Sequence, residues 1–174
     1  MHHPSHYHSP LNLGSAKERA NARGLAVLAA MTGYHHRGEM VYTEGAARWS
    51  GIQDHRLAYK GEFPRAADCS AFVTWCLWNA AEHFRIHQDF VNGLRWAEGY
   101  TGTMVEHGLP VDLKHLLTAD ALFWGGSHSV PQHTTIYVGH GLTVSHGSPG
   151  GPHLLTVQQM ASALPFNQAR RYIR

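Results

Sequence analysis

The chain has 174 residues, with 14 Lys and Arg against 12 Asp and Glu and a formal net charge of +2. This length suits one domain with a proper core, and 43% hydrophobic with 15% charged residues is typical of a globular protein rather than a disordered or collagen-like one. A charge this small and dispersed gives no reason to expect nucleic acid as a partner, and the longest apolar run, from Leu25 to Met31, is too short to span a bilayer.

The N-terminal segment is rich in histidine, within Met1-His2-His3-Pro4-Ser5-His6-Tyr7-His8. It is either a metal-binding tract or a frayed polar terminus, and we expect residues 1–14 to be flexible. The segment lacks the basic region and apolar stretch of a secretory signal, so we expect synthesis in a cytoplasm without one. A single domain is expected over residues 15–174.

The first predicted helix begins after Ser15, which forms a capping-box pattern with Glu18, and runs to about residue 32. We expect Gly33 to end it and its inward stripe to hold Leu25, Leu28 and Ala29. A short strand is predicted at residues 41–43, followed by a long loop with fragments of helix at 44–64.

Beyond residue 64 the predicted elements are first helices and then, after residue 120, mainly strands. The strongest predicted helix spans residues 68–84, and two short helices broken at Gly99 and Gly102 are expected between 88 and 108. Beyond residue 120 we expect strands at 121–124, 133–138 and 142–146, a short helix at 156–163 and an edge strand at 171–173. Helices first and strands later imply an α+β domain.

The two cysteines, Cys69 and Cys76, exclude a disulfide scaffold and a multi-thiolate zinc site. Seven residues apart on a helix, they are separated by about 10 Å, too far for a bond. If Asp68 is the N-cap, Cys69 falls in the first turn, where free N–H groups and the helix dipole favour a thiolate. Cys69 is therefore either a nucleophile or a buried small hydrophobe, whereas Cys76 is expected to be core.

A thiolate nucleophile needs a base, and residues 133–146 offer one. The segment predicts a hairpin, in which a two-residue turn at Gly139-His140 would pair His133 directly with His146, with Cβ atoms about 5 Å apart on one face. The two imidazoles would then act as base and orienting partner. A three-residue turn would instead place His146 opposite Thr134 and put the histidines on opposite faces.

At these residues the sequence resembles the NlpC/P60 family of cysteine peptidases. Residues 68–73 are similar to the family's Asp-Cys-Ser-Gly followed by two apolar positions, with Ala71 in place of the glycine. Residues 133–139 match its His-x-x-Ile-Tyr-x-Gly, and residues 119–123 look like the Gly-Asp-Leu strand before that histidine. Stretches within 41–52 and 145–148 resemble peptidase modules of endolysins from phages of actinobacteria, so the resemblance covers roughly residues 40–174.

The resemblance implies a papain-like α+β fold in permuted order, with the nucleophile at a helix N-terminus packed on an antiparallel sheet. It implies Cys69 as nucleophile, His133 as general base and His146 as third member, without a metal or cofactor. In that mechanism His133 takes the thiol proton to give an ion pair, and the Cys69 N–H stabilises the oxyanion together with a tyrosine. Tyr42 fits this role best by its strand-then-glycine context, and Tyr59 is the second choice.

The implied substrate is the stem peptide of peptidoglycan, commonly cut between D-glutamate and the diamino acid. By the same resemblance Asp68 and Ser70, which flank the nucleophile, can read the free amine of that peptide. Trp49 is a further candidate for the substrate groove, whereas Trp75 and Trp78 are expected in the core. We expect a monomer that binds no nucleic acid, does not insert stably into membranes, and acts at the wall after release from the host cytoplasm.

Three other functions stay open on the sequence alone. A zinc-dependent wall amidase would use histidines and one cysteine as ligands, although the chain lacks a compact spacing such as His-Glu-x-x-His. A non-catalytic wall- or metal-binding module would use the histidines and aromatic residues. A related cysteine amidase delivered as an antibacterial toxin would need a neighbouring immunity gene.

Overall fold

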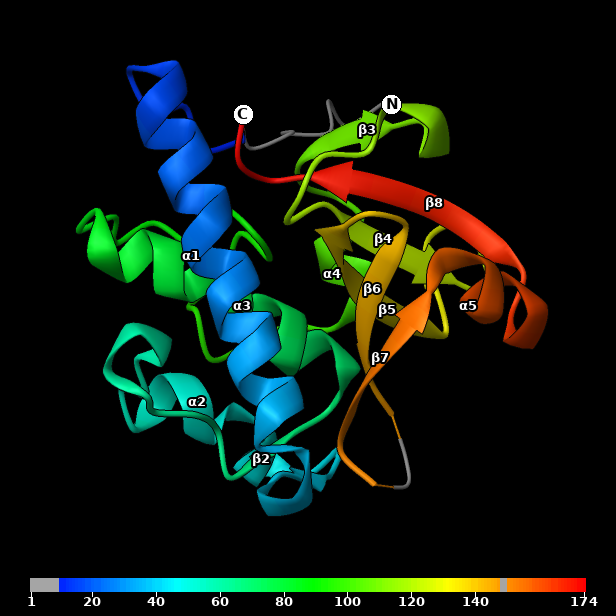
Figure 1. Ribbon diagram of the computed structural model, residues 1–174, viewed down its shortest axis with the longest axis horizontal. Helices are drawn as coiled ribbons and strands as arrows, with labels where there is room; N and C mark the ends of the chain where they lie inside the picture. Colours follow the sequence, from blue (N-terminus) through cyan, green and yellow to red (C-terminus); the bar gives the residue numbers. More distant parts are fainter. Residues whose placement is uncertain (1–9, 148–149) are drawn as a thin grey trace, which may run out of the picture.

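The computed structural model describes residues 10–147 and 150–174, which form helices on one side and a sheet on the other (Figure 1). The histidine tract of residues 1–8, for which metal binding and fraying were both considered, lies outside the described residues. The predicted α+β class is confirmed.

Helix α1 (Ala16–His35) packs across helix α3 (Cys69–His83), as Figure 1 shows in blue and green. The predicted capping box is confirmed, since Ser15 Oγ accepts from the Glu18 N–H and Glu18 Oε2 accepts from the Ser15 N–H. The prediction that Gly33 ends the helix is wrong. Gly33 lies inside α1, where an added Cβ would come within 2.5 Å of the Phe72 ring.

The predicted inward stripe of α1 is also wrong in part, because the buried face is lined by small residues. Leu28 is 43% exposed, whereas the fully buried positions are Ala22, Ala26, Ala29 and Ala30. Small side chains let the axes of α1 and α3 approach closely, which two leucines would prevent. Of the predicted stripe, Ala29 is fully buried and Leu25 packs against the core partly buried, so only Leu28 is misplaced.

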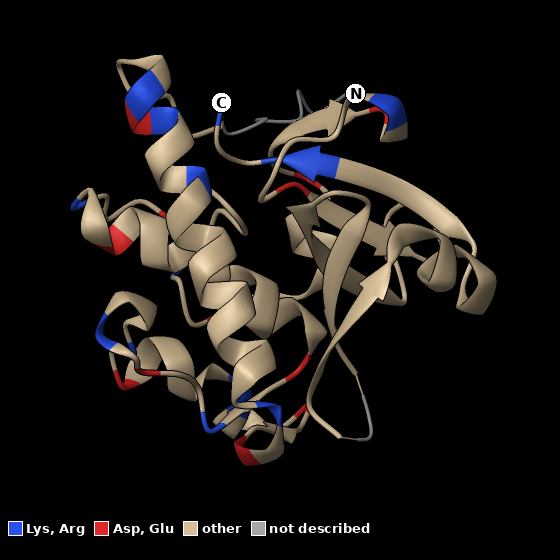
Figure 2. Ribbon diagram, viewed as in Figure 1, with Lys and Arg blue, Asp and Glu red and all other residues tan. Residues whose placement is uncertain are grey.

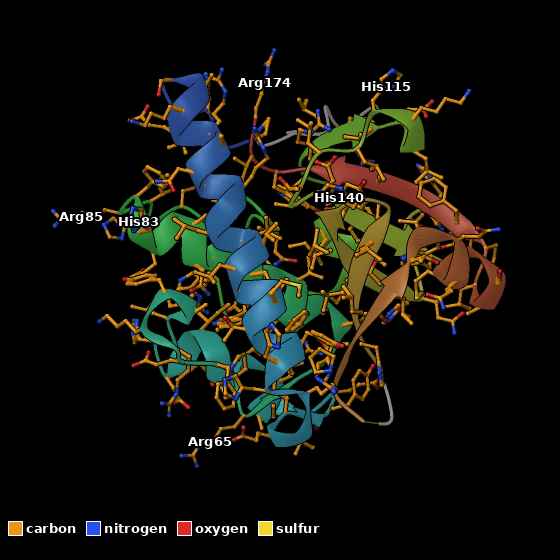
Figure 3. All side chains as sticks on the ribbon, in the orientation of Figure 1. Arg65, His83, Arg85, His115, His140 and Arg174 are labelled. Carbon is orange, nitrogen blue, oxygen red and sulfur yellow. The ribbon has the colours of Figure 1, made fainter. Side chains whose placement is uncertain are left out.

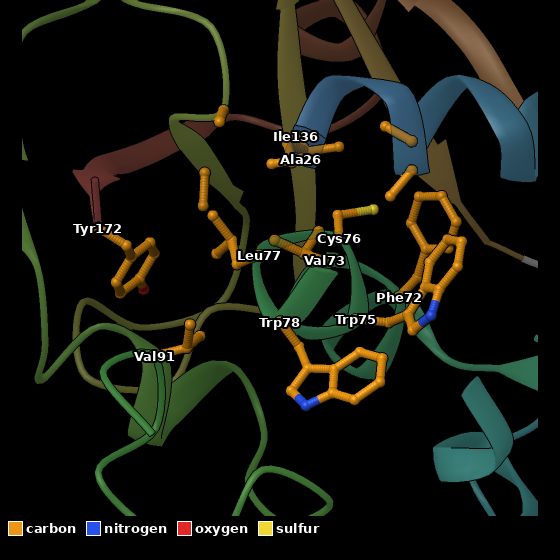
Figure 4. Packing of buried hydrophobic residues seen from close by; sticks show 14 of the residues in the cluster. Ala26, Phe72, Val73, Trp75, Cys76, Leu77, Trp78, Val91, Ile136 and Tyr172 are labelled. Atoms are coloured by element: carbon orange, nitrogen blue, oxygen red, sulfur yellow. The ribbon is translucent and has the colours of Figure 1, made fainter. Parts of the chain in front are cut away.

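Helix α3 is the central element of the core. Asp68 caps it as predicted, and every residue from Cys69 to Ala81 is buried. Figure 4 shows Trp75, Trp78 and Cys76 among the packed apolar side chains, which confirms the three core predictions. Both cysteines are free, as the spacing predicts.

The sheet has six strands in the order β3-β8-β4-β5-β6-β7, all antiparallel to their neighbours. The bounds are β3 Leu109–Val111, β4 Ala121–Trp124, β5 His133–Gly139, β6 Leu142–His146, β7 Pro152–Thr156 and β8 Phe166–Arg171. One face packs on α1 and α3 through Ile136 and Val144, and the other packs on α5 (Val157–Ala163) through Met160.

The strands at 121–124, 133–139 and 142–146 and the helix α5 confirm their predictions. The expected edge strand at 171–173 is wrong, because β8 ends at Arg171 and lies inside the sheet. The edges are β3 and β7, which the sequence analysis missed. Between residues 88 and 108 there is one short helix, α4 (Thr101–Met104), which contains Gly102 rather than breaking there.

A small parallel pair of strands links the loop region to the start of α3. Strand β1 (Val41–Tyr42) confirms the prediction at 41–43 and pairs with β2 (Ala66–Ala67), in the register Tyr42 to Ala67. The segment between them holds η2 (Ala46–Trp49), α2 (Ser50–Gln53) and η3 (Ala58–Lys60), as the predicted loop with helical fragments. Two further single turns are η1 (Arg37–Glu39) and η4 (Leu113–His115).

The described part of the N-terminal segment is held by the C-terminus. The Leu11 N–H donates to the Tyr172 carbonyl at 2.8 Å, and the Arg174 N–H donates to the Leu11 carbonyl at 3.1 Å. Leu11 and Leu13 also pack against the core. The prediction of a flexible segment reaching residue 14 is therefore wrong for these residues.

Charged side chains lie mainly on the helices and loops, whereas β5, β6, β7 and α5 carry none (Figure 2). Within residues 10–147 and 150–174, no helix combines the length and apolar character needed to cross a membrane.

Candidate active site

Cys69 is the first residue of α3, so its thiol lies at the end of the helix where backbone N–H groups have no helical partner. The N–H groups of Thr134, Ser70 and Cys69 itself point toward the sulfur. Thr134 belongs to β5, so the thiol lies against the start of that strand. Burial, followed by the Asp68 charge, nevertheless raises the pKa of the Cys69 thiol to about 12, although the three N–H groups oppose the shift.

His133, the first residue of β5, precedes the Thr134 whose N–H faces the sulfur. Its Nε2 lies 2.8 Å from Oγ of Ser145 on the neighbouring strand β6. Burial lowers the pKa of His133 to about 4; His146 adds to the shift and Asp68 opposes it. Burial therefore disfavours a charge on either group, while the ion pair of Cys69 and His133 stays a prediction.

The predicted pairing of His133 with His146 is wrong. The register joins Ile136 to Val144 and Tyr137 to Thr143, with an irregularity before Gly139. Continued along the strands, it places His146 opposite Thr134, the arrangement predicted for the longer turn. The cause is the turn itself, because residues 139, 140 and 141 all have positive φ and add one residue to the connection.

Ser145 takes the position that the sequence analysis gave to His146. Because side chains alternate along a strand, Ser145 and His133 share one face of the sheet, and Ser145 makes the hydrogen bond to the base. The sequence analysis missed Ser145 because it favoured the two-residue turn. The alternative three-residue turn would have placed residue 145 on the same face of the sheet as His133.

His146 lies on the opposite face, completely buried between Phe72 of α3 and Tyr42 of β1. Its ring centroid is 5.6 Å from that of Phe72 and 5.5 Å from that of Tyr42, the latter edge-on. Neither ring nitrogen has a hydrogen-bond partner among the described residues. Burial lowers the pKa of His146, although nearby backbone carbonyls, including that of Val41, oppose the shift. His146 therefore packs as a neutral ring that supports Tyr42.

Neither a family model nor a curated protein matches this chain. Rv1477, a hypothetical invasion protein of Mycobacterium tuberculosis, is 20% identical with a TM-score of 0.60, covering 95% of this chain and 71% of that one. The NlpC/p60 domain of the peptidoglycan hydrolase SagA is 20% identical with a TM-score of 0.55, covering 86% and 97%. The chain has the NlpC/P60 fold. NlpC1 from Trichomonas vaginalis is a further match at 17% identity and a TM-score of 0.55, covering 94% and 46%.

The fold predicted from the cysteine and histidine motifs is thereby confirmed. The chain spans less than half the length of both Trichomonas proteins that it matches, at 46% and 49%.

Of the two candidate tyrosines, Tyr42 lies within electrostatic reach of the Cys69 thiol. Burial raises the pKa of Tyr42, and Cys69 is the first of the neighbouring charges that add to the shift. Tyr59 is 44% exposed and lies edge-on to His83. His83 is the last residue of α3 and is labelled in Figure 3. His83 follows Cys69 by fourteen positions along the helix, a rise of about 21 Å at 1.5 Å per residue. Tyr59 is therefore too far from the thiol to take part.

Asp68 and Ser70 lie beside the nucleophile in this NlpC/P60 fold, but their hydrogen bonds are internal. Oδ1 of Asp68 accepts from the Ser70 hydroxyl at 2.9 Å and from the Ala71 N–H at 2.7 Å, while Oδ2 accepts from Arg48 at 3.0 Å. Both residues are buried. In the structure the carboxylate of Asp68 is thus engaged within the protein, and its amine-reading role stays a prediction.

Trp49 is 6% exposed and belongs to the core, which leaves it little surface for a substrate. This burial does not favour the groove role of Trp49, which stays a prediction. Surface next to the site exists instead beside β1, where a cavity of about 290 Å³ is lined in part by Arg37, Val41 and Tyr42. Among the residues that the structure describes, no group of three or more His, Cys, Asp or Glu is arranged to hold a metal ion.

Proposed function

We propose that the chain is a cysteine peptidase that hydrolyses an amide bond in the stem peptide of peptidoglycan, with Cys69 as nucleophile and His133 as general base. One observation carries the proposal. The Cys69 thiol, at a helix N-terminus, interacts with the N–H of the residue that follows His133, and Nε2 of that imidazole lies 2.8 Å from Ser145 Oγ. A nucleophile, a base and an orienting hydroxyl are the parts that thiol catalysis requires.

The hydrogen bond to Ser145 supports a proposal for the roles of the two nitrogens of His133. If Nε2–H donates to Ser145 Oγ, Nδ1 is left unprotonated and able to take the thiol proton. Since burial disfavours a charge on either group, we propose that proton transfer accompanies attack of the sulfur on the amide carbonyl carbon. His133 then protonates the departing amine, and water hydrolyses the thioester to release the acid and free the thiol.

The charge that develops on the carbonyl oxygen needs donors at the site. The N–H of Cys69 is available at the first turn of α3, and the hydroxyl of Tyr42 is the second proposed donor. In the structure that hydroxyl makes one long hydrogen bond, 3.4 Å to Glu44 Oε1. A bond this long is easily exchanged for one to an oxyanion.

The finer assignments of the proposal come from the motif resemblance together with the fold. We propose cleavage between D-glutamate and the diamino acid, by a monomeric endolysin-type enzyme whose residues 15–174 form a single catalytic domain. It would be made in the host cytoplasm of a phage-infected bacterium and act on the wall after release.

The test is digestion of purified peptidoglycan, with mass spectrometry of the released fragments. We expect new ends at one stem-peptide bond, complete loss of cleavage in Cys69→Ala, and cleavage retained in the matched variant Cys76→Ala, whose thiol is in the core. A haloacetamide should abolish activity and a chelator should spare it. Cleavage by Cys69→Ala would refute the thiol mechanism, and loss of cleavage with the chelator alone would favour a metal-dependent amidase.

A further inference from the structure

Arg48, in η2, ties together segments on both sides of the nucleophile. Its Nη1 donates to Oδ2 of Asp68 at 3.0 Å, and its Nη2 donates to the carbonyl of Gly99 at 3.1 Å. The guanidinium lies 5.4 Å from the centroid of the buried Trp49 ring. The side chains of Arg48 and Asp68 are 23% and 8% exposed. A shielded ion pair with a planar donor fixed on two sides restrains its partners far more than a surface pair does.

The turn at Gly99 also holds the strand of the base. Gly99 has a φ of +107°, and an added Cβ would lie 2.4 Å from Oδ1 of Asn92, so the shape of this turn requires glycine. Thr101, two residues further on, donates its hydroxyl to the carbonyl of Pro131 at 2.6 Å. Pro131 precedes His133 by two residues. Arg48 and Thr101 thus join the cap of α3 and the start of β5 through one short turn.

Asp68 also places a negative charge next to both reacting groups. Its charge adds to the rise in the pKa of Cys69 and opposes the fall in the pKa of His133. A neighbouring anion disfavours a thiolate, and among the described residues Arg48 is the cation paired with this anion. The other titratable groups that face the thiol or its nearest neighbours are Tyr42, Glu44, His133 and His146.

We propose that Arg48 is a positioning residue for the hydrolysis: it holds the cap of α3 in place relative to the start of β5 and offsets the charge of Asp68 beside the nucleophile. The inference rests on the proposed function. Arg48 acts through Asp68 and Gly99, and it contacts neither the sulfur nor the imidazole in the hydrogen bonds described.

The first measurement is the pH dependence of Cys69 alkylation by iodoacetamide, in a Cys76→Ala background so that one thiol is followed. Arg48→Gln should move the alkylation midpoint upward by about one pH unit, because the Asp68 charge is no longer offset. Arg48→Lys keeps the charge and should leave the midpoint near that of the parent. Arg95→Gln is the matched control, since Arg95 forms an ion pair with Glu98 and its side chain is 87% exposed.

The second measurement separates charge from position by turnover. Arg48→Gln should lower kcat about tenfold or more with little change in KM, since geometry rather than substrate affinity is lost. Arg48→Lys should also lower kcat, because one ammonium cannot reproduce the planar fork between Asp68 and Gly99. In Asp68→Asn, which keeps a good N-cap without the charge, adding Arg48→Gln should no longer move the alkylation midpoint.

An alkylation midpoint and kcat that stay at the parent values in Arg48→Gln would overturn the inference. An equal upward shift of the midpoint in the Asp68→Asn background would overturn the charge part of it. If Arg48→Gln does not fold, as judged by circular dichroism, Arg48→Lys decides the positioning part. Alkylation needs no peptidase activity, so a parent protein that cleaves no peptidoglycan would count against the proposed function, not against the effect of Arg48 on the thiol.

Discussion

Replacing Ser145 with alanine tests the register of β5 and β6 and the orientation of the base together. The change removes the 2.8 Å hydrogen bond to Nε2 of His133, at a position where Ser145 is 6% exposed and water cannot easily replace it. Leaving a buried donor or acceptor unpaired costs about 1–3 kcal/mol. If that loss falls on the transition state, kcat drops by about 5- to 150-fold.

The assay is initial rates of stem-peptide release, with thermal unfolding measured on the same samples. Thr143→Val is the matched control. Thr143 lies two residues away on the same strand and face, is fully buried, and donates its hydroxyl to the Ile136 carbonyl at 2.9 Å. This variant should lose comparable stability, while its kcat stays within about twofold of the parent because it does not touch His133.

His146→Gln provides the opposing case. From its packing between Phe72 and Tyr42, we expect this variant to lose stability and to affect the rate only through Tyr42. A Ser145→Ala enzyme with parental kcat, alongside a well-folded His146→Gln enzyme that has lost turnover, would show that His146 orients the base and that the register argument is mistaken.

Tyr42→Phe should lower kcat about 100- to 1000-fold by removing an oxyanion donor, whereas Tyr59→Phe should match the parent in the same rate assay; the reverse order would move the role to Tyr59. The depressed pKa of His133 means that the unfolded chain binds the proton first, so stability present at neutral pH is lost as pH falls from 6.5 toward 4. Urea unfolding at pH 7 and pH 5 should show a loss of about 2 kcal/mol from this residue, absent in His133→Gln. Gly33→Ala should destabilise by about 1–3 kcal/mol, because its Cβ meets an aromatic ring at 2.5 Å, while Gly24→Ala, in open space on the same helix, should stabilise by about 1 kcal/mol; equal effects in thermal unfolding would contradict the packing.

Features that depend on neighbouring residues in the sequence could be predicted. The capping box at Ser15, the cap at Asp68 and the strand beginning at His133 each rest on a few adjacent side chains with a local physical preference. These features already place the thiol at a helix terminus and the imidazole at a strand terminus. The α+β class follows from the same local patterns.

Features that depend on partners distant in the chain could not be predicted. The register of β5 and β6 depends on a turn in which three consecutive residues have positive φ. One of the three is His140, and a histidine does not indicate a positive φ as a glycine would. The buried face of α1 is set by how closely α3 approaches, not by where the leucines are. The contact of Arg48 with Asp68 joins residues 20 positions apart and leaves no periodic trace in the sequence.

The position of Asp68 favours coupled proton transfer and attack over a stable thiolate. Its negative charge disfavours a charge on the Cys69 sulfur and favours a proton on His133. In the proposed mechanism the negative charge passes from the sulfur to the substrate oxygen while the imidazole becomes positive. As attack proceeds, the repulsion between Asp68 and the charge on the sulfur therefore decreases, while the attraction between Asp68 and the imidazolium increases. The carboxylate thus stabilises the transition state relative to a free ion pair.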